Sequence, residues 1–294
     1  MNFRCIPQAL GVILLTAVAL VAGPARTSDT GQNRDEQASA ERVLHFPKDR
    51  SLGSLFVQDA DAVRHIGTFY HAGGAENDDA WEYLDQATGD VVIPSGKRAY
   101  LVIGQKAWRD LSPLSKLSPG DLYGLELAVV SVPADDRCMR HLAHLTGLRV
   151  LSLEWTDVGD EGLRSLRGMK ALERLTLPRG ITDAGLAHLT KLRSLRGLYF
   201  KENRITNEGL AHLTKLGALE ELELGGGYKD NAGTWHKSRI NDAGLVHLAR
   251  LPSLRYLQLW GDFTDAGLVH LKDVPSLWAL KGTLLITALP AVRC

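Results

Sequence analysis

The fold is decided by residues 172–200, which read LERLTLPRGITDAGLAHLTKLRSLRGLYF. The stretch opens with a phrase of the form LxxLxL, continues through a polar turn and an apolar helical segment, and reaches the next phrase at Leu195. The same phrase begins at Leu148 and Leu219, so neighbouring copies start 24, 23 and 24 residues apart. A fixed period that joins one strand to one helix predicts a solenoid, in which each unit packs against its neighbours.

Weaker copies extend this array in both directions. The first positions of the phrase give eight strand units, which begin at residues 98, 122, 148, 172, 195, 219, 254 and 277. Only the step from 219 to 254 is long, at 35 residues, and its excess is the block GGGYKDNAGTWHKS at 225–238. We therefore predict one insertion, placed between the strand and the helix of a single repeat, and degenerate outer repeats that act as caps.

Each unit has an internal logic. The leucines of a strand face the core and the residues between them face outward, while successive strands form one parallel sheet with helices behind it. Because helices are bulkier than strands, the stack should curve with the sheet on its concave side. Short polar pairs mark the helix starts, where a side-chain oxygen can accept from free backbone amides: Thr182-Asp183, Thr206-Asn207, Asn241-Asp242 and Thr264-Asp265. A glycine two residues later costs helix stability, so we expect it to make room for the adjacent repeat.

These motifs carry a family resemblance. The phrase LxxLxL followed by ITDAGLxxL resembles leucine-rich repeats of the cysteine-containing kind, and TDAGLAHLTKL is similar to arrays in secreted proteins of planctomycete-type bacteria. The resemblance covers about residues 98–289 and implies an α/β leucine-rich repeat solenoid, while it is much less specific about the role of the protein. Eukaryotic members often serve as substrate-recognition arms of ubiquitin ligases. That role is less favoured here, because nothing before Arg98 is similar to the helical F-box that those proteins carry.

The N-terminus predicts export. Arg4 precedes thirteen uninterrupted apolar residues, Leu10–Ala22, and the small residues of Gly23-Pro24-Ala25 follow. This order is typical of a secretory signal, here residues 1–25, and the apolar run falls short of the roughly twenty residues that cross a bilayer. We expect a secreted or periplasmic protein without a membrane span in its mature form, and a disordered polar linker over residues 26–42.

Residues 43–97 are predicted to form a small antiparallel β module that caps the repeat domain, residues 98–294. Strand-like runs occur at 52–57, 64–70, 81–84 and 90–94. The acids Glu76, Asp78 and Asp79 between them lack the glycine and ligand spacing of a known calcium loop, so a solvated loop is the better interpretation. An enzyme with its site in residues 43–97 remains an alternative function.

Composition and motifs favour a protein without catalytic function. The formal net charge is zero, which gives no indication of a nucleic-acid or anionic-membrane partner. The chain contains no GxSxG, HExxH or GxxxxGK[ST] motif, so we predict no enzyme activity, no cofactor and no metal. Five histidines stand seven residues before the next first leucine and should be half-buried structural residues rather than zinc ligands: His141, His188, His212, His247 and His270.

The two cysteines of the mature chain are not expected to pair. Cys138 stands in the slot that glycine occupies in other repeats, which predicts a small packed position, and Cys294 lies at the far end of the array. Units stacked about 4.7–4.9 Å apart would separate the two sulfurs by far more than a disulfide allows.

The outward positions of the strands make the concave face the candidate site. We predict protein binding there, with an unknown partner, through aromatic and charged side chains of the strands, their ends and the insertion: Glu154, Trp155, Arg174, Tyr199, Lys201, Glu221, Glu223, Tyr256, Gln258, Trp260, Tyr228 and Trp235. A second hypothesis is binding of cell-wall carbohydrate, with Trp155, Tyr199, Tyr256 and Trp260 as stacking platforms.

Overall fold

The computed structural model describes residues 40–62, 81–107, 109–127, 134–200, 202–229 and 233–284, and the backbone of 15–20. The predicted linker, the strand-like run at 64–70, the acidic loop and Cys294 lie outside or almost wholly outside these residues, as do the side chains of residues 228, 229, 283 and 284.

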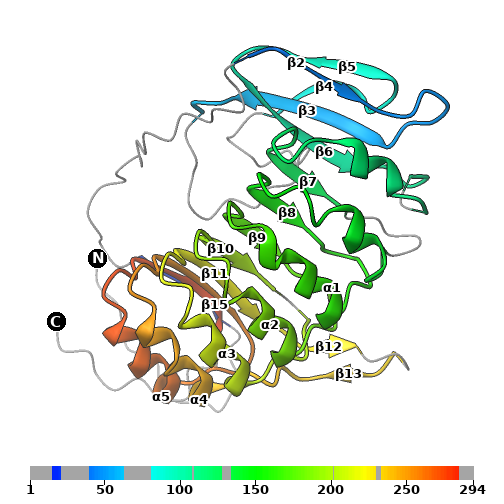
Figure 1. Cartoon of the computed structure of the whole chain (residues 1–294). Coiled ribbons are helices and arrows are strands. Elements are labelled where there is room, and N and C mark those ends of the chain that lie inside the picture. Colours follow the sequence, from blue (N-terminus) through cyan, green and yellow to red (C-terminus); the bar gives the residue numbers. More distant parts are fainter. Residues whose placement is uncertain are drawn as a thin grey trace.

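Eight parallel strands stand side by side in chain order and form the main sheet (Figure 1). They are β6 (Lys97–Ile103), β7 (Gly124–Glu126), β8 (Val150–Ser152), β9 (Arg174–Thr176), β10 (Gly197–Tyr199), β11 (Glu221–Gly225), β14 (Tyr256–Trp260) and β15 (Ala279–Leu284). Each falls on one of the eight predicted phrases, so the predicted repeat count and fold class are confirmed. The protein is a leucine-rich repeat solenoid of the α/β class.

An antiparallel module extends the sheet at its N-terminal end (Figure 1). β3 pairs antiparallel with both β6 and β4, and β2 pairs antiparallel with β5. The new strands are β2 (Arg42–His45), β3 (Gly53–Asp59), β4 (Glu82–Gln86) and β5 (Asp90–Ile93). Leu44, Leu55 and Ile93 are fully buried and belong to the same apolar core as the repeat leucines. The module therefore caps the first repeat, as predicted.

At the other end of the sheet, β1 (Leu15–Leu20) pairs antiparallel with β15. This strand lies inside the predicted signal segment. Cleavage after Ala25 stays a prediction, and it would remove β1 and leave β15 as the edge strand of the sheet.

Short helices pack behind the strands. The α-helices are α1 (Asp160–Arg164), α2 (Asp183–Leu189), α3 (Asn207–Leu213), α4 (Asp242–Leu245) and α5 (Asp265–Leu268), and the 3-10 helices are η2 (Ser112–Lys116), η3 (Cys138–His141), η4 (Ser165–Gly168), η5 (Leu248–Arg250) and η6 (Val269–Asp273). Leucines from strand and helix meet between the two layers, where Leu186, Leu195 and Leu198 are at most 1% exposed. Figure 1 shows α1–α5 along one side of the curved stack.

A chain of carboxylate–threonine contacts joins the helix starts of successive repeats; we call it the Asp–Thr ladder. Thr182 caps α2 by accepting from the Ala184 amide, as the sequence predicts, and its own N–H and O–H donate to the Asp160 carboxylate at 3.0 and 2.5 Å. The pairs Thr206–Asp183 and Thr264–Asp242 repeat this arrangement. One repeat thus supplies the acid that holds the cap of the next.

The ladder explains the recurrent glycine. A Cβ built on Gly209 would lie 2.7 Å from Cγ of Asp183, inside any real contact distance. The same conflict with the preceding repeat exists at Gly162, Gly185, Gly244 and Gly267. Glycine is therefore needed where the acid of the neighbouring repeat reaches the helix, which confirms that it makes room for the adjacent unit.

At one step of the ladder, asparagines stand in place of both the aspartate and the threonine. The cap of α4 is Asn241, which has an acceptor oxygen and no hydroxyl, and its partner in the preceding repeat is Asn207. Asn207 Oδ1 accepts from the backbone N–H of Asn241 at 3.1 Å, and Asn207 Nδ2 donates to Asn241 Oδ1 at 2.9 Å. An aspartate could not supply that second donor, so the two asparagines belong together.

Cys138 occupies the glycine slot at the start of the array without conflict. The acid that matches it in the preceding repeat is Asp110, which instead forms an ion pair with Arg50 and accepts from the Ser112 amide. The Cys138 thiol is half-buried and donates to the Asp135 carbonyl, and burial raises its pKa. It is the packed position that we predicted rather than a reactive thiolate.

The insertion forms a small hairpin between β11 and α4, as its position in the sequence predicts. β12 (Tyr228–Lys229) pairs antiparallel with β13 (Trp235–His236). The chain leaves the sheet at Gly225 and Gly226, whose φ angles of 100° and 82° are left-handed and suit glycine.

The five histidines that precede the next strand phrase are half-buried, as predicted: His141, His188, His212, His247 and His270. Within the described residues there is no group of histidine, cysteine and acidic side chains that could hold a metal ion. A search of the same residues finds no helix with the length and apolar character that a membrane crossing requires.

Candidate interaction surface: the concave face and its rim

Two rows of outward side chains cross the parallel strands. The register of the sheet places the residues of the first row next to one another in the order Gly124, Val150, Arg174, Gly197, Glu221, Tyr256 and Ala279. The second row runs Glu126, Ser152, Thr176, Tyr199, Glu223, Gln258 and Lys281. Because neighbouring strands lie about 4.7–4.9 Å apart, side chains of adjacent repeats can touch along each row.

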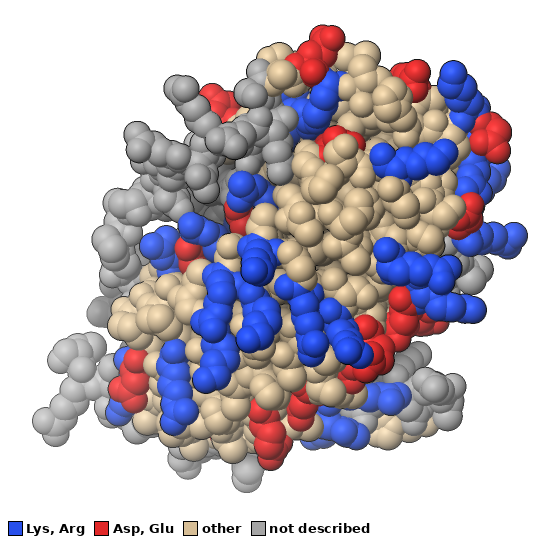
Figure 2. Space-filling view, viewed as in Figure 1, with Lys and Arg blue, Asp and Glu red and all other residues tan. Residues whose placement is uncertain are grey.

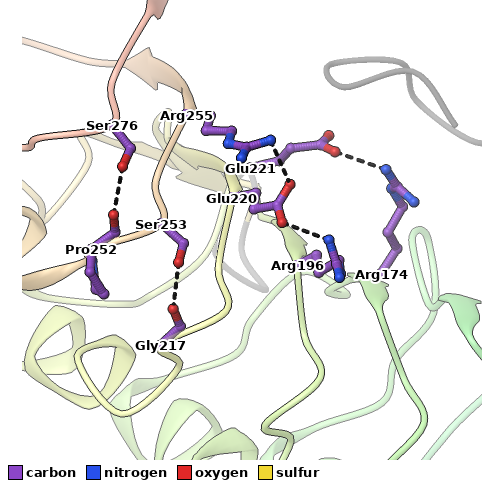
Figure 3. A network of polar contacts seen from close by, with 9 residues as sticks. All are labelled: Arg174, Arg196, Gly217, Glu220, Glu221, Pro252, Ser253, Arg255 and Ser276. Atoms are coloured by element: carbon purple, nitrogen blue, oxygen red, sulfur yellow. Dashed lines mark hydrogen bonds and ion pairs between the residues drawn. The ribbon is translucent and has the colours of Figure 1, made fainter. Parts of the chain in front are cut away.

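A buried ion pair spans three strands in the middle of the face. Arg174 on β9 donates to Glu221 Oε1 on β11 at 2.9 Å, and Tyr199 on β10 donates its hydroxyl to Glu221 Oε2 at 2.6 Å. Gly197 lies between Arg174 and Glu221, and a Cβ there would meet the Tyr199 hydroxyl at 2.6 Å. The missing side chain lets the tyrosine lie across the sheet. Figure 3 shows Arg174 and Glu221 pointing toward one another.

The ionisation of this cluster follows from its burial. Desolvation, and then the charge of Glu221, raise the pKa of Tyr199 well above its ordinary value. The phenol therefore keeps its proton and remains the donor to the carboxylate. The guanidinium and the carboxylate are 6% and 1% exposed, so their attraction is poorly screened by water.

A second set of contacts continues toward β14. Trp260 Nε1 donates to Glu223 Oε1 at 2.7 Å, and the Tyr256 hydroxyl donates to Gln258 Oε1 at 2.9 Å. Burial, followed by the charges of Glu223 and Glu221, raises the pKa of Tyr256. Glu221 and Glu223 thus place two buried carboxylates on neighbouring positions of one strand, each held by donors from other repeats.

Burial divides the predicted site residues. Five of them are less than 9% exposed, so the expectation of open concave side chains is wrong for these positions: Arg174, Tyr199, Glu221, Glu223 and Gln258. The physical reason is that they bond to one another across the strands. Glu154, Tyr256 and Trp260 are half-buried, whereas Trp155 and Trp235 are 43% and 59% exposed. Lys201 and the side chain of Tyr228 lie outside the described residues.

Of the two exposed predicted residues, Trp155 lies just past the end of β8 and Trp235 lies in the inserted hairpin. We use the name aromatic rim for these two residues together with Arg179, Glu202 and Trp260. The Arg179 guanidinium lies 3.8 Å from the centre of the Trp155 ring, and its Nε lies 3.0 Å from Glu202 Oε2. Trp155 and Glu202 have φ angles of 62° and 55°, and they are the only left-handed residues other than glycine among those described. Such a backbone is costly for a bulky residue.

Sequence reasoning missed Arg179 and Glu202. Both stand two residues after the last apolar position of their strand phrase, Leu177 or Phe200, as Trp155 does after Leu153. That shared position is the signal that could have found them, because equivalent positions of successive repeats lie side by side.

The N-terminal end of the face carries a buried cation that the sequence reasoning also missed. Arg98 is 2% exposed and donates from Nε to Gln58 Oε1 at 2.9 Å. Its guanidinium lies 4.4 Å from the Tyr123 ring centre and 5.5 Å from that of Trp81. Aromatic faces attract a cation, so these rings stabilise the buried charge.

Charged pairs follow the strands at their N-terminal ends. Arg149 pairs with Glu173 at 2.5 Å, while Arg196 and Arg255 both pair with Glu220, at 2.7 and 3.7 Å. Figure 3 shows Glu220 between its two arginines, and also the serine hydroxyls of Ser253 and Ser276 donating to backbone carbonyls of preceding repeats. Contacts between repeats therefore also occur at the N-terminal ends of the strands.

No family model and no curated protein matches this chain. Among solved structures, an internalin (InlF) from Listeria monocytogenes is 22% identical with a TM-score of 0.45, over 62% of this chain and 47% of that one. An internalin C2 from the same organism is 23% identical with a TM-score of 0.42, over 59% and 66%. A TLR13–ssRNA13 complex is 15% identical with a TM-score of 0.32, over 59% and 31%. The chain spans about half of the first structure and slightly less than two thirds of the second.

Proposed function

We propose that this is a non-catalytic protein-binding leucine-rich repeat protein that acts outside the cytoplasm, secreted or periplasmic. Its contact surface is the concave face, and within that face the aromatic rim makes the direct contacts. The rim offers large rings beside charges, and interfaces are enriched in tryptophan and arginine for the same reason: rigid apolar area combined with selectivity.

The observation that carries the proposal is the exposed stack of Trp155 on Arg179. A tryptophan that is 43% exposed leaves apolar surface in water, and its left-handed backbone adds a cost of about 1–3 kcal/mol. Stability alone favours glycine at this turn, as Gly226 and Gly261 have at the matching position of later repeats. Retaining tryptophan there is explained by a contact that the ring makes with a partner.

The buried network has a supporting role in this proposal. Hydrogen bonds among Arg174, Tyr199 and Glu221 join three strands, and Glu223 accepts a hydrogen bond from the indole N–H of Trp260. A side chain whose orientation is set before binding loses less entropy on association. Glu154, just past β8, and Tyr256, on β14, stay candidates for direct contact, whereas Gln258 is buried and accepts from the Tyr256 hydroxyl. Lys201 and Tyr228 stay candidates on their positions in the sequence.

Carbohydrate stacking on this face is the weaker alternative. Tyr199 is only 5% exposed, and Arg179 covers one face of the Trp155 ring. Of the four proposed platforms, Tyr199 therefore has no open ring face and Trp155 has only one.

The test is site-specific photo-crosslinking in an envelope extract. A benzoyl-phenylalanine at position 155 or 235 should give the same discrete protein adduct, whereas the same probe at Ala184, an exposed position on α2, should not. With the adduct identified and purified, Trp155→Ala should weaken its binding by at least about tenfold, or about 1.4 kcal/mol.

Adducts of equal pattern at all three positions would contradict the proposal, as would binding that Trp155→Ala leaves unchanged. A Trp155→Gly variant serves as the control for folding, because it removes the ring while suiting the left-handed backbone.

A further inference from the structure

A row of cations follows the edge of the solenoid where helices lead into strands. Five matching segments run from the histidine slot to the first leucine of the next phrase: 165–172, 188–195, 212–219, 247–254 and 270–277. Together they hold seven lysines and arginines, one acid, Asp273, and no phenylalanine, tyrosine or tryptophan. We call the seven cations the basic edge: Arg167, Lys170, Lys191, Arg193, Lys215, Arg250 and Lys272.

The basic edge is open to solvent. All seven side chains are exposed, and within the described residues none of them forms an ion pair. Arg167 contacts His188 Nδ1 at 2.7 Å, and Arg193 donates to the Lys215 carbonyl at 3.1 Å. By contrast, the arginines at the strand starts, such as Arg149 and Arg196, have glutamate partners.

Figure 2 shows lysine and arginine side chains gathered side by side over the lower repeats, with few acids among them. The acids of the same repeats stand at the opposite end of the helices, at Asp160, Asp183, Asp242 and Asp265. The net charge of zero therefore conceals an uneven distribution of charge along the solenoid. A surface lined by one sign concentrates ligands of the other.

We propose that the basic edge binds a linear acidic polysaccharide, through its carboxylates, independently of the aromatic rim. The shape of the surface points to a linear ligand, since one or two cations recur in each of five stacked repeats. Repeats are separated by about 5 Å at the sheet and by about 8–10 Å between helices, so the positive charges follow a line with that spacing.

Two other polyanions fit less well. Surfaces that bind single-stranded nucleic acid combine charge with aromatic platforms for the bases. The five segments carry no phenylalanine, tyrosine or tryptophan, and the histidines that open four of them are half-buried. An anionic membrane presents a plane of charge rather than a line, and it favours basic surfaces that also bury apolar side chains. The choice of a polysaccharide rests on the predicted secretion, which would place such polymers within reach.

The experiment measures binding of the mature protein to polygalacturonate at low ionic strength, because surface charges are screened within about 8–10 Å at physiological salt. The test variant carries Lys191→Glu, Lys215→Glu and Arg250→Glu. The control variant carries Lys48→Glu, Lys106→Glu and Arg109→Glu, which changes the net charge equally at exposed positions outside the basic edge. Circular dichroism melting checks that both variants are folded.

We expect the test variant to lose at least about tenfold in affinity and the control to stay within about twofold. Methyl-esterified polygalacturonate should not bind, and Trp155→Ala should bind like the parent protein, which separates this proposal from the protein-binding rim. Equal losses in both variants would overturn the basic edge as the site. The polysaccharide would be ruled out as the ligand if the protein did not bind polygalacturonate, or if it bound only a single-stranded oligonucleotide or anionic vesicles.

Discussion

The Asp–Thr ladder and the concave network both join one repeat to the next, yet they are built on opposite plans. In the ladder the same pair recurs, as Thr182 with Asp160 and Thr206 with Asp183. On the concave face no row repeats a residue in neighbouring strands: Arg174, Gly197 and Glu221 stand at equivalent positions. Recurrence suits an architectural task that every repeat shares, whereas each contact on the concave face is particular to the few repeats that make it.

The largest effect is expected from Glu221→Ala. This change leaves the buried Arg174 guanidinium without the carboxylate at 2.9 Å and removes the acceptor of the Tyr199 hydroxyl. Breaking a buried pair from one side destabilises by about 3–5 kcal/mol, which urea unfolding will measure. The triple variant Arg174→Met, Tyr199→Phe, Glu221→Met should regain most of that stability, since apolar residues of similar volume replace buried charges well. A triple variant as unstable as Glu221→Ala would contradict this account.

Gly209→Ala tests the ladder. In an exposed helix this substitution stabilises by up to about 1 kcal/mol, but here the new methyl group would press on Asp183, so we expect a loss of about 1–3 kcal/mol. The informative measurement is a double-mutant cycle with Asp183→Ala. If the methyl group costs as much without the acid as with it, the glycine serves another purpose. Gly168→Ala is the matched control, because nothing lies within 4 Å of a Cβ there.

Alkaline pH should distinguish the two regions further. The pKa of Tyr199 is raised in the folded protein, so above pH 10 the unfolded chain loses a proton that the folded chain keeps. Stability is therefore complete below pH 10 and falls above it, by at most about 1.4 kcal/mol per pH unit from this group. Urea unfolding between pH 9 and 11 should show a smaller decline for Tyr199→Phe than for the parent. Identical slopes would mean that the tyrosine is not the titrating group.

The smallest effect on stability is expected from removing the insertion. Trp235 is 59% exposed, and the hairpin leaves the sheet at two glycines, so residues 225–238 contribute little to the core. Replacing them with the short connection found between Phe200 and Ile205 should shift the melting temperature by a few degrees at most, since loop entropy changes slowly with length. Partner binding should weaken by at least about tenfold. Unchanged affinity would separate the hairpin from the binding surface.

The sequence predicted the architecture well because the period of the leucines determines it. All eight strands, the cap residues such as Thr206, and the reason for Gly209 were accessible from spacing and residue type. The concave site was predicted less well. Alternation shows that Tyr199 points away from the leucines, but it does not show that Gly197 lets its ring lie down against Glu221. That depends on contacts between repeats.

The basic edge was missed for a different reason. A net charge of zero describes the whole chain, and it is silent about which residues share a surface. Lys191, Lys215 and Arg250 occupy the same place after the histidine in three successive repeats. Aligning the repeats with one another and counting charge column by column would have revealed the row. In a solenoid, charge is best counted by position within the repeat.

The ladder also bears on how such a protein grows. An inner unit carries one acid for the unit that follows and one threonine and glycine for the unit before, so its two ends are complementary. Copying a unit in tandem, from Asp183 to the residue before Asn207 for example, would join an old end to an identical new one without any further substitution. The Asn207–Asn241 step follows the same rule, because a copy that begins at Asn207 and ends at Asn241 carries both asparagines together. Lengthening the array by gene duplication is therefore easiest when the copied segment begins at the acid, or its asparagine equivalent, and ends at the cap that it holds.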